Sequence, residues 1–206
     1  MYRIVFLRNY SWLLLLLLIA CNETSMVNSL PYYNTPDFTP HFIAASEAKQ
    51  RINHTIAPFS FTNQHNQIIN NKSIKNKIHV ANFIFTSCGS ICPKMTHNLK
   101  LVDSAFANDK DIVLLSYSVT PWIDSVPRLK LFAQNYKINN PNWHLLTGDK
   151  SAIYTLARRS YFAEEDLGFT KDSTEFLHTE HTMLVDRTGR LQLIKDIRVL
   201  KKEDRE

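Results

Sequence analysis

Two cysteines separated by three residues form the group in this sequence best suited to chemistry. Cys88 and Cys92 stand four positions apart, and Pro93 follows the second of them. Residues 79–85, HVANFIF, are rich in β-branched and aromatic side chains and predict a buried strand. Apolar residues at helical spacing follow, so the cysteines are expected on a strand-to-helix turn. A helix N-terminus stabilises thiolates, which bind soft metals and exchange disulfides.

The N-terminal segment predicts export from the cytoplasm. Arg3 and Arg8 precede an unbroken apolar run over residues 12–20, which is shorter than the roughly 20 residues that span a bilayer. The run ends in LIAC and resembles the lipobox of bacterial lipoproteins. This resemblance implies that residues 1–20 are a signal peptide and that Cys21 carries a lipid, which anchors an extracytoplasmic domain to a bacterial membrane. An ordinary signal peptide with an incidental Cys21 is the alternative.

Removal of Cys21 from the count leaves one pair of thiols, Cys88 and Cys92, in a compartment that permits disulfides. The pair is therefore a disulfide, a metal site, or both at different times. Two cysteines exclude an iron–sulfur cluster held by four cysteines of one chain. A trigonal copper site with two sulfurs needs only one further ligand, such as a histidine.

The elements that must position this pair alternate between strand and helix. Strands are expected over residues 56–62, 67–69, 79–85, 111–119 and 143–146. A hairpin around Gly189 is expected to begin at residue 182. Helices are expected after Cys92, over residues 129–136, after Asp149 and over residues 193–200. This order predicts an α/β fold, thioredoxin-like, with a central mixed β-sheet flanked by helices on both faces. The thioredoxin motif itself has two residues between its cysteines rather than three.

Length and charge define the organisation further. The 206 residues suffice for one domain, assigned to residues 52–206, which follows a tether and N-terminal extension over residues 21–51. Without Arg3 and Arg8, 22 basic residues remain against 19 acidic ones. The basic residues are scattered, so no nucleic-acid partner is expected.

Eight histidines could supply a further ligand. His178 and His181 stand apart because they directly precede the predicted strand that begins at residue 182. In thioredoxin-like folds the loop before that strand lies against the cysteine turn. The other six have no special placement and are read as surface or core residues: His41, His54, His65, His79, His97 and His144.

Residues 85–93, FTSCGSICP, resemble the FTxCxxxCP motif of the Sco/SenC family. The resemblance extends through residues 58–61 (PFSF), 119–125 (VTPWIDS) and 143–148 (WHLLTG) to the histidines and the hairpin. Members are membrane-tethered, thioredoxin-like copper proteins that help to build the copper centre of cytochrome oxidase. In that family the metal histidine stands six residues before a strand leucine and eleven before the turn glycine.

His178 meets both counts, against Leu184 and Gly189, whereas His181 meets neither. The resemblance therefore implies copper as the bound metal, with Cys88, Cys92 and His178 as its ligands. His181 is a bystander or a substitute ligand.

Three features depart from the family pattern. Gly89 stands where proline is frequent, and Thr120 replaces a common aspartate before Pro121. Only 17 residues follow Gly189, which leaves room for either a further strand or a terminal helix. The helical spacing over residues 193–200 favours the helix.

The resemblance implies a copper metallochaperone of the cell envelope that serves a terminal cytochrome oxidase. The copper-centre subunit of that oxidase, or another copper or thiol protein, is the expected partner. The rival interpretation is a thiol–disulfide oxidoreductase, which needs Cys88 and Cys92 but not His178. A third class is a copper or redox sensor. Oxidation of the pair competes with metal binding, because only the reduced thiols accept copper.

Overall fold

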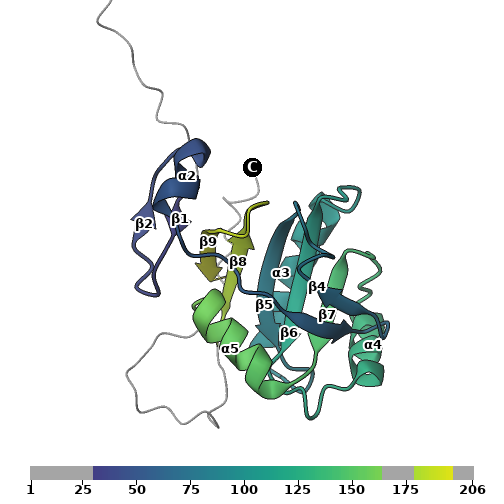
Figure 1. Cartoon of the computed structure of the whole chain (residues 1–206). Coiled ribbons are helices and arrows are strands. Elements are labelled where there is room, and N and C mark those ends of the chain that lie inside the picture. The colour runs from purple at the N-terminus through teal and green to yellow at the C-terminus, as the bar shows by residue number, and fades with distance from the viewer. Residues whose placement is uncertain (1–29, 164–178, 197–206) are drawn as a thin grey trace, which may run out of the picture.

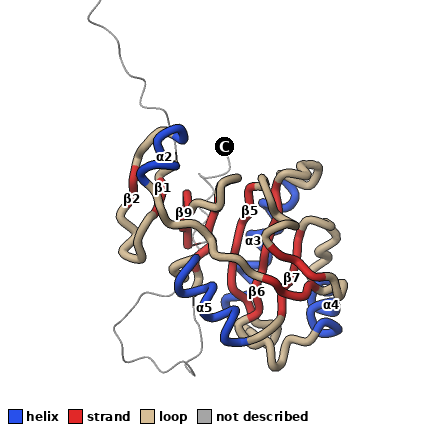
Figure 2. The backbone as a smooth tube through the Cα atoms, viewed as in Figure 1, coloured by secondary structure: helices blue, strands red, loops and turns tan. Residues whose placement is uncertain are grey.

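The computed structural model describes residues 30–163 and 179–196. Residues 1–20, Cys21 and His178 lie outside this part of the chain. A sheet with the strand order β4-β3-β7-β6-β5-β8-β9 forms the centre of the fold (Figures 1 and 2). Its strands are β3 (Ser60–Asn63), β4 (Ile68–Asn70), β5 (Ile78–Ile84), β6 (Ile112–Ser118), β7 (Trp143–Thr147), β8 (His181–Val185) and β9 (Leu191–Asp196).

The sheet is mixed, as the sequence predicts. β5, β6 and β7 run parallel at its centre. β3 pairs antiparallel with β7 on one side, and β8 pairs antiparallel with β5 on the other. β5 and β6 are buried along nearly their whole length, because both faces of these strands are covered. This agrees with their nearly continuous apolar sequences.

Helices cover both faces of the sheet, which confirms the predicted thioredoxin-like architecture. Val80 and Ile84 of β5 belong to one core cluster with residues of α3 (Ile91–Ala105) and α4 (Val126–Asn135). Ala81 and Phe83 point to the opposite face and cluster with α5 (Lys150–Ser160). Alternate residues of one strand therefore build two separate cores.

Residues 30–51, which the sequence assigns to the tether and extension, form β1 (Tyr32–Tyr33), β2 (Pro40–His41) and α2 (Ala45–Arg51). β1 contacts β9, and Arg190 Nε donates a hydrogen bond to the carbonyl of Ile52 at 3.0 Å (Figure 1). Two strands of two residues and one helix of seven give no readable periodicity, so the sequence did not predict these elements.

The prediction of a helix over residues 193–200 is wrong for residues 193–196, which the structure describes. Residues up to Asp196 belong to β9, and Leu193 and Ile194 pair with Leu184 and Met183 of β8. Ladder pairing with β8 and packing against β1 override a local pattern that also fits a helix. Within residues 30–163 and 179–196, no helix is long and apolar enough to cross a membrane.

A buried histidine makes the stability of this fold sensitive to acid. His79 of β5 is 2% exposed, and its Nε2 lies 3.0 Å from the hydroxyl of Tyr161. Burial lowers the pKa of His79 to about 3, and the nearby Asp186 offsets only part of this effect. The unfolded chain takes up a proton near the ordinary histidine value of about 6.5, whereas the folded protein does not. This contribution to stability is thus complete above about pH 6.5 and declines as the pH falls towards 3.

We predict that His79→Gln is less stable than wild type at pH 7 but loses less unfolding free energy on acidification. The difference in slope between about pH 6 and pH 4 should approach ~1.4 kcal/mol per pH unit, which corresponds to one proton. Urea unfolding at several pH values measures it, with the exposed His97 replaced in the control variant His97→Gln. Parallel curves for His79→Gln and wild type would show that His79 does not carry this dependence.

Candidate functional site

The cysteine turn lies between β5 and α3, as the sequence predicts. Cys88 is half-buried, and Cys92 is 4% exposed in the first turn of α3. The Cys88 N–H donates to the carbonyl of Phe85 at 3.2 Å, and the Cys92 N–H donates to Cys88 Sγ at 3.4 Å. A Cβ added at Gly89 would meet no atom within 4 Å, so close packing does not require glycine there.

The two thiols differ in how readily they ionise. Burial opposes ionisation of Cys88, but hydrogen bonds from the backbone N–H groups of Cys92, Ser90 and Ile91 outweigh it and lower the pKa of Cys88. Burial raises the pKa of Cys92 to about 12, although a backbone hydrogen bond at Phe85 opposes the rise. Cys88 is therefore the more readily ionised thiol of the pair, and Cys92 is the less readily ionised one.

We predict that Cys88 reacts with iodoacetamide about tenfold faster than Cys92, or more, at neutral pH. Mass spectrometry of Cys92→Ser measures the rate of Cys88, and the same measurement on Cys88→Ser gives the rate of Cys92. Serine at position 92 keeps the backbone N–H that donates to Cys88 Sγ. Each rate should rise with pH, with a midpoint below the ordinary thiol value for Cys88 and well above it for Cys92. Equal rates in the two folded variants would contradict this asymmetry.

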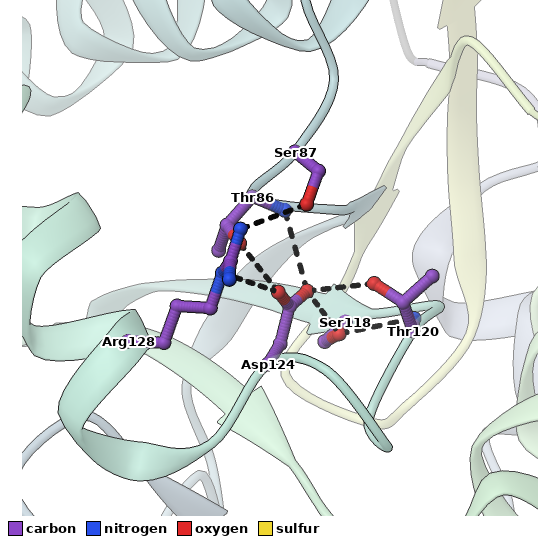
Figure 3. A network of polar contacts seen from close by, with 6 residues as sticks. All are labelled: Thr86, Ser87, Ser118, Thr120, Asp124 and Arg128. Carbon is purple, nitrogen blue, oxygen red and sulfur yellow. Dashed lines mark hydrogen bonds and ion pairs between the residues drawn. The ribbon is translucent and has the colours of Figure 1, made fainter.

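A buried carboxylate ties the cysteine turn to the rest of the sheet. Asp124 has no exposed surface and accepts hydrogen bonds from Thr86, Ser118 and Thr120 (Figure 3). Thr86 contributes both its hydroxyl, at 2.5 Å, and its backbone N–H, at 3.3 Å. Because Thr86 stands two residues before Cys88, these bonds fix the start of the turn.

Arg128 of α4 completes the network. Its Nε donates to the Thr86 hydroxyl at 2.6 Å and lies 3.7 Å from Asp124 Oδ1, and its Nη2 donates to the Ser87 hydroxyl at 2.8 Å (Figure 3). Ser125, which follows Asp124, occupies the N-cap position of α4 without a side-chain cap bond. No pattern in the sequence joins Asp124 to Thr86, which is 38 residues away.

We predict that Asp124→Asn lowers the unfolding free energy by about 1–3 kcal/mol, because it disrupts several buried hydrogen bonds. Loosening of Thr86 should also raise the alkylation rate of Cys92 in the folded protein. The control is Asp149→Asn, which removes a carboxylate that caps α5 by accepting from the Ala152 N–H at 2.8 Å. An Asp124→Asn protein that still protects Cys92 as wild type does would show that the network does not hold the turn.

The expected histidine ligand, His178, lies outside the described residues. Its neighbour His181 begins β8, and the His181 ring meets the ring of Phe38 edge-on, with centroids 5.9 Å apart. His181 Nδ1 is buried and has no hydrogen-bond partner among the residues described. Among residues 30–163 and 179–196, no group of three or more histidine, cysteine, aspartate or glutamate side chains could hold a metal ion, and Cys88 and Cys92 are both free thiols.

Other histidines are bound into the fold. His54 stacks on Phe162 at 4.2 Å between ring centroids, and His144 Nδ1 lies 3.2 Å from the side-chain amide of Asn63. His79 bonds to Tyr161 in the core. The structure thus gives these three side chains packing roles.

Comparisons with known proteins agree with the geometry. The SCO1/SenC family model matches residues 47–203. The SCO1 protein homolog of Bacillus subtilis (strain 168) is 38% identical over 119 residues, which cover 57% of this chain and 62% of that protein. The chain spans less than two thirds of the length of the curated relatives it matches.

Solved structures give the same picture. A SCO1/SenC family lipoprotein from Bacillus anthracis str. Ames aligns with a TM-score of 0.63 at 28% identity and covers 75% of this chain and 91% of its own. BsSco, described with a disulfide switch and as a member of the Sco family of cytochrome c oxidase assembly proteins, aligns at 0.61 and 29% identity over 75% and 90% of the two chains. Bradyrhizobium japonicum ScoI, with copper bound, aligns at 0.56 and 25% identity over 69% and 90%.

Proposed function

The chain belongs to the SCO1/SenC family, and from this premise we propose that it is a copper-binding metallochaperone of the cell envelope. It delivers copper to, or matures the copper centre of, a terminal cytochrome oxidase. Support comes from the copper bound to Bradyrhizobium japonicum ScoI and from the description of BsSco as belonging to a family of oxidase assembly proteins.

The observation that carries this proposal is the position of the two thiols relative to β8. Cys88 and Cys92 follow the carboxyl end of β5. β8 is antiparallel to β5, with Met183 opposite Ala81, so the chain enters β8 at that same end. A ligand that directly precedes β8 in the sequence is therefore suited to meet the cysteine turn.

Three residues are proposed as copper ligands: Cys88, Cys92 and His178. Two soft thiolates select Cu(I), and one imidazole completes a trigonal site. His178 is proposed from its sequence spacing to Leu184 and Gly189. His181 is the rival nitrogen donor, and its packing against Phe38 inside the fold supports a bystander role.

The proposed location is the cell envelope, with the domain anchored by lipid to a bacterial membrane and facing the periplasm or extracytoplasmic side. Residues 1–20 would be removed as a signal peptide, and Cys21 would carry the lipid. Residues 21–51 would join the anchor to the domain at 52–206, and β1 of this joining segment contacts β9. The lipoprotein from Bacillus anthracis supports this arrangement.

A thiol–disulfide oxidoreductase is the second candidate, and the unequal thiols favour it. The Cys88 thiolate would attack one sulfur of a partner disulfide and release the other sulfur as a thiolate. Cys92, once deprotonated, would attack Cys88 Sγ and release the partner's remaining thiol. The partner thereby gains two electrons and two protons, and Cys88 and Cys92 end as a disulfide. The disulfide switch described for BsSco supports such chemistry.

Copper binding by the reduced protein tests the first proposal. We expect one Cu(I) per chain. In competition with a Cu(I) chelator, His178→Ala should weaken Cu(I) affinity about tenfold or more, because one of the three proposed metal ligands is lost. The matched variant His181→Ala should bind as wild type does.

Equal affinity of His178→Ala and wild type would refute the assignment of His178. Disulfide reduction that continues at the wild-type rate in His178→Ala, together with weak copper binding by wild type, would favour the oxidoreductase.

A further inference from the structure

The sheet presents two different ends, and the cysteine turn occupies one of them. Cys88 follows the carboxyl end of β5, whereas the β8–β9 turn lies at the amino end of β5, because β5 and β8 are antiparallel. Arg187 of that turn donates to the carbonyl of Asn76 and to the carboxylate of Asp111, both at 2.9 Å. At about 3.3 Å per residue, the length of β5 separates the two ends by roughly 20 Å.

The N-terminal extension runs along β8 and β9 from one end of the sheet to the other (Figure 1). Phe38, between β1 and β2, contacts His181 at the start of β8, so this turn points towards the cysteine end. Tyr32 of β1 lies near the other end, because burial and then the nearby carboxylate of Asp186 raise the pKa of Tyr32. β1 therefore begins, and β2 ends, at the end opposite to the cysteines.

A short stretch of chain joins this opposite end to the proposed anchor. Leu30, the first residue that the structure describes, stands nine positions after Cys21. A fully extended chain spans at most about 3.6 Å per residue, so Leu30 lies within roughly 32 Å of the cysteine proposed to carry the lipid. With Cys21 at the membrane surface, the end of the sheet beside Leu30 is the end held close to the bilayer.

Large apolar side chains are exposed at this same end. Phe42 is 71% exposed just after β2, and Leu30 is 41% exposed just before β1. Phe106 is 46% exposed at the C-cap of α3. Because α3 begins at the cysteine turn and leads to the amino end of β6, its last residue also lies opposite to the cysteines. Exposed phenylalanine and leucine beside basic residues are typical of surfaces that lie on a membrane.

Basic residues outnumber acidic ones at this end. We define the amino face by the segments that lie there, which are Leu30 and residues 42–53, 75–77, 106–111, 137–142 and 186–190. The amino face holds eight basic and four acidic residues. Ion pairs between described residues of the face join Arg51 to Glu47 and Arg187 to Asp111. The lysines outside these pairs are Lys49, Lys75, Lys77, Lys110 and Lys137.

The cysteine end has no such excess of positive charge. Its loops over residues 85–90, 119–128 and 148–150 hold two basic and two acidic residues. One of each, Arg128 and Asp124, lie 3.7 Å apart. The positive charge and the short link to the anchor thus coincide at the amino face, which favours an anionic lipid surface as the partner of that face.

We propose that the amino face lies on the membrane that holds the lipid anchor and binds the headgroups of anionic phospholipids. The lysines pair with headgroup phosphates, and Phe42 and Phe106 enter the boundary between headgroups and acyl chains. The cysteine turn then faces away from the bilayer, towards protein domains that project from the membrane. This inference rests on the proposed location, because the anchor keeps the face at a membrane.

NMR of the lipid-modified chain in nanodiscs tests this orientation. The probe is a mixture of phosphatidylcholine and phosphatidylglycerol in which some headgroups carry a spin label. We expect the label to broaden the amide signals of Phe42, Phe106 and Lys110 and to leave those of Ser90 and Ile123 sharp. The broadening should fall about twofold or more in pure phosphatidylcholine, or when the ionic strength rises from about 0.05 to about 0.5 M, because the attraction of opposite charges is lost or screened.

Variants of the amino face supply the second readout. Phe42→Ser, and the double variant Lys75→Glu with Lys110→Glu, should each reduce the broadening at Phe106 about twofold or more. Ile123→Ser is the matched control, because Ile123 is 41% exposed in the loop after the carboxyl end of β6. Broadening that is strongest at the cysteine turn, that spreads evenly over the surface, or that neither variant of the face changes overturns the proposal.

Mass spectrometry of Cys21 separates this proposal from the proposed location. A lipid on Cys21 together with evenly spread broadening keeps the location and overturns the orientation. An unmodified Cys21 removes the anchor; vesicles of the same lipids that still bind this chain through Phe42 and Lys110 would keep the face as a lipid site, and vesicles that do not bind it would overturn both. Copper binding by the reduced chain depends on neither result.

Discussion

The position of the cysteine turn depends on one buried carboxylate. Asp124 has no contact with solvent, and three hydroxyl groups and a backbone N–H donate to it. Burial of such a group is costly unless it is fully hydrogen-bonded, so the arrangement fixes each of its donors. One donor residue, Thr86, leads into Cys88, and another, Ser118, ends β6. The reactive turn is thus fastened to the centre of the sheet rather than left as a loose loop.

This network also gives a physical account of Thr120. In the family pattern that the sequence resembles, an aspartate is common at this position. Here the Thr120 hydroxyl donates to Asp124 at 2.9 Å and its backbone N–H donates to the Ser118 hydroxyl at 3.1 Å. A second carboxylate at position 120 would accept rather than donate and would repel Asp124 at close range. Threonine therefore suits a network with a single buried negative charge.

Sequence reasoning was most successful where chemistry and periodicity are local. The strand before Cys88 and the helix after Cys92 follow from apolar patterns within about 30 residues, and the structure contains both. It failed where distant segments decide the outcome. The apolar pattern of residues 193–196 also fits a helix, and pairing with β8 makes these residues a strand. β1 and β2 are two residues each, too short to show periodicity, and they pair with each other. The bond from Thr86 to Asp124 leaves no trace in either local sequence.

The N-terminal extension supports the start of β8, the strand that pairs antiparallel with β5. Phe38, held at a positive φ of 54°, contacts Phe162 and His181. A bulky residue adopts this backbone conformation only where surrounding contacts compensate for the strain. Thr35 and Thr39 both donate hydrogen bonds to the Asp37 carboxylate and shape the turn that presents Phe38. The start of β8 is therefore supported by the segment that the sequence assigns to the tether.

Three segments of the candidate site lie at the same end of the sheet, and their combination bears on the choice between the candidate functions. The cysteine turn follows β5, the loop that holds Asp124 follows β6, and the chain enters β8 beside the end of β5. Ligands gather at the carboxyl ends of parallel strands because the loops there are free to vary. Two unequal thiols alone serve reduction as well as metal binding. A nitrogen ligand that precedes β8 in the sequence would serve only metal binding. The choice between chaperone and reductase therefore depends on the residues that precede β8, and not on the cysteines themselves.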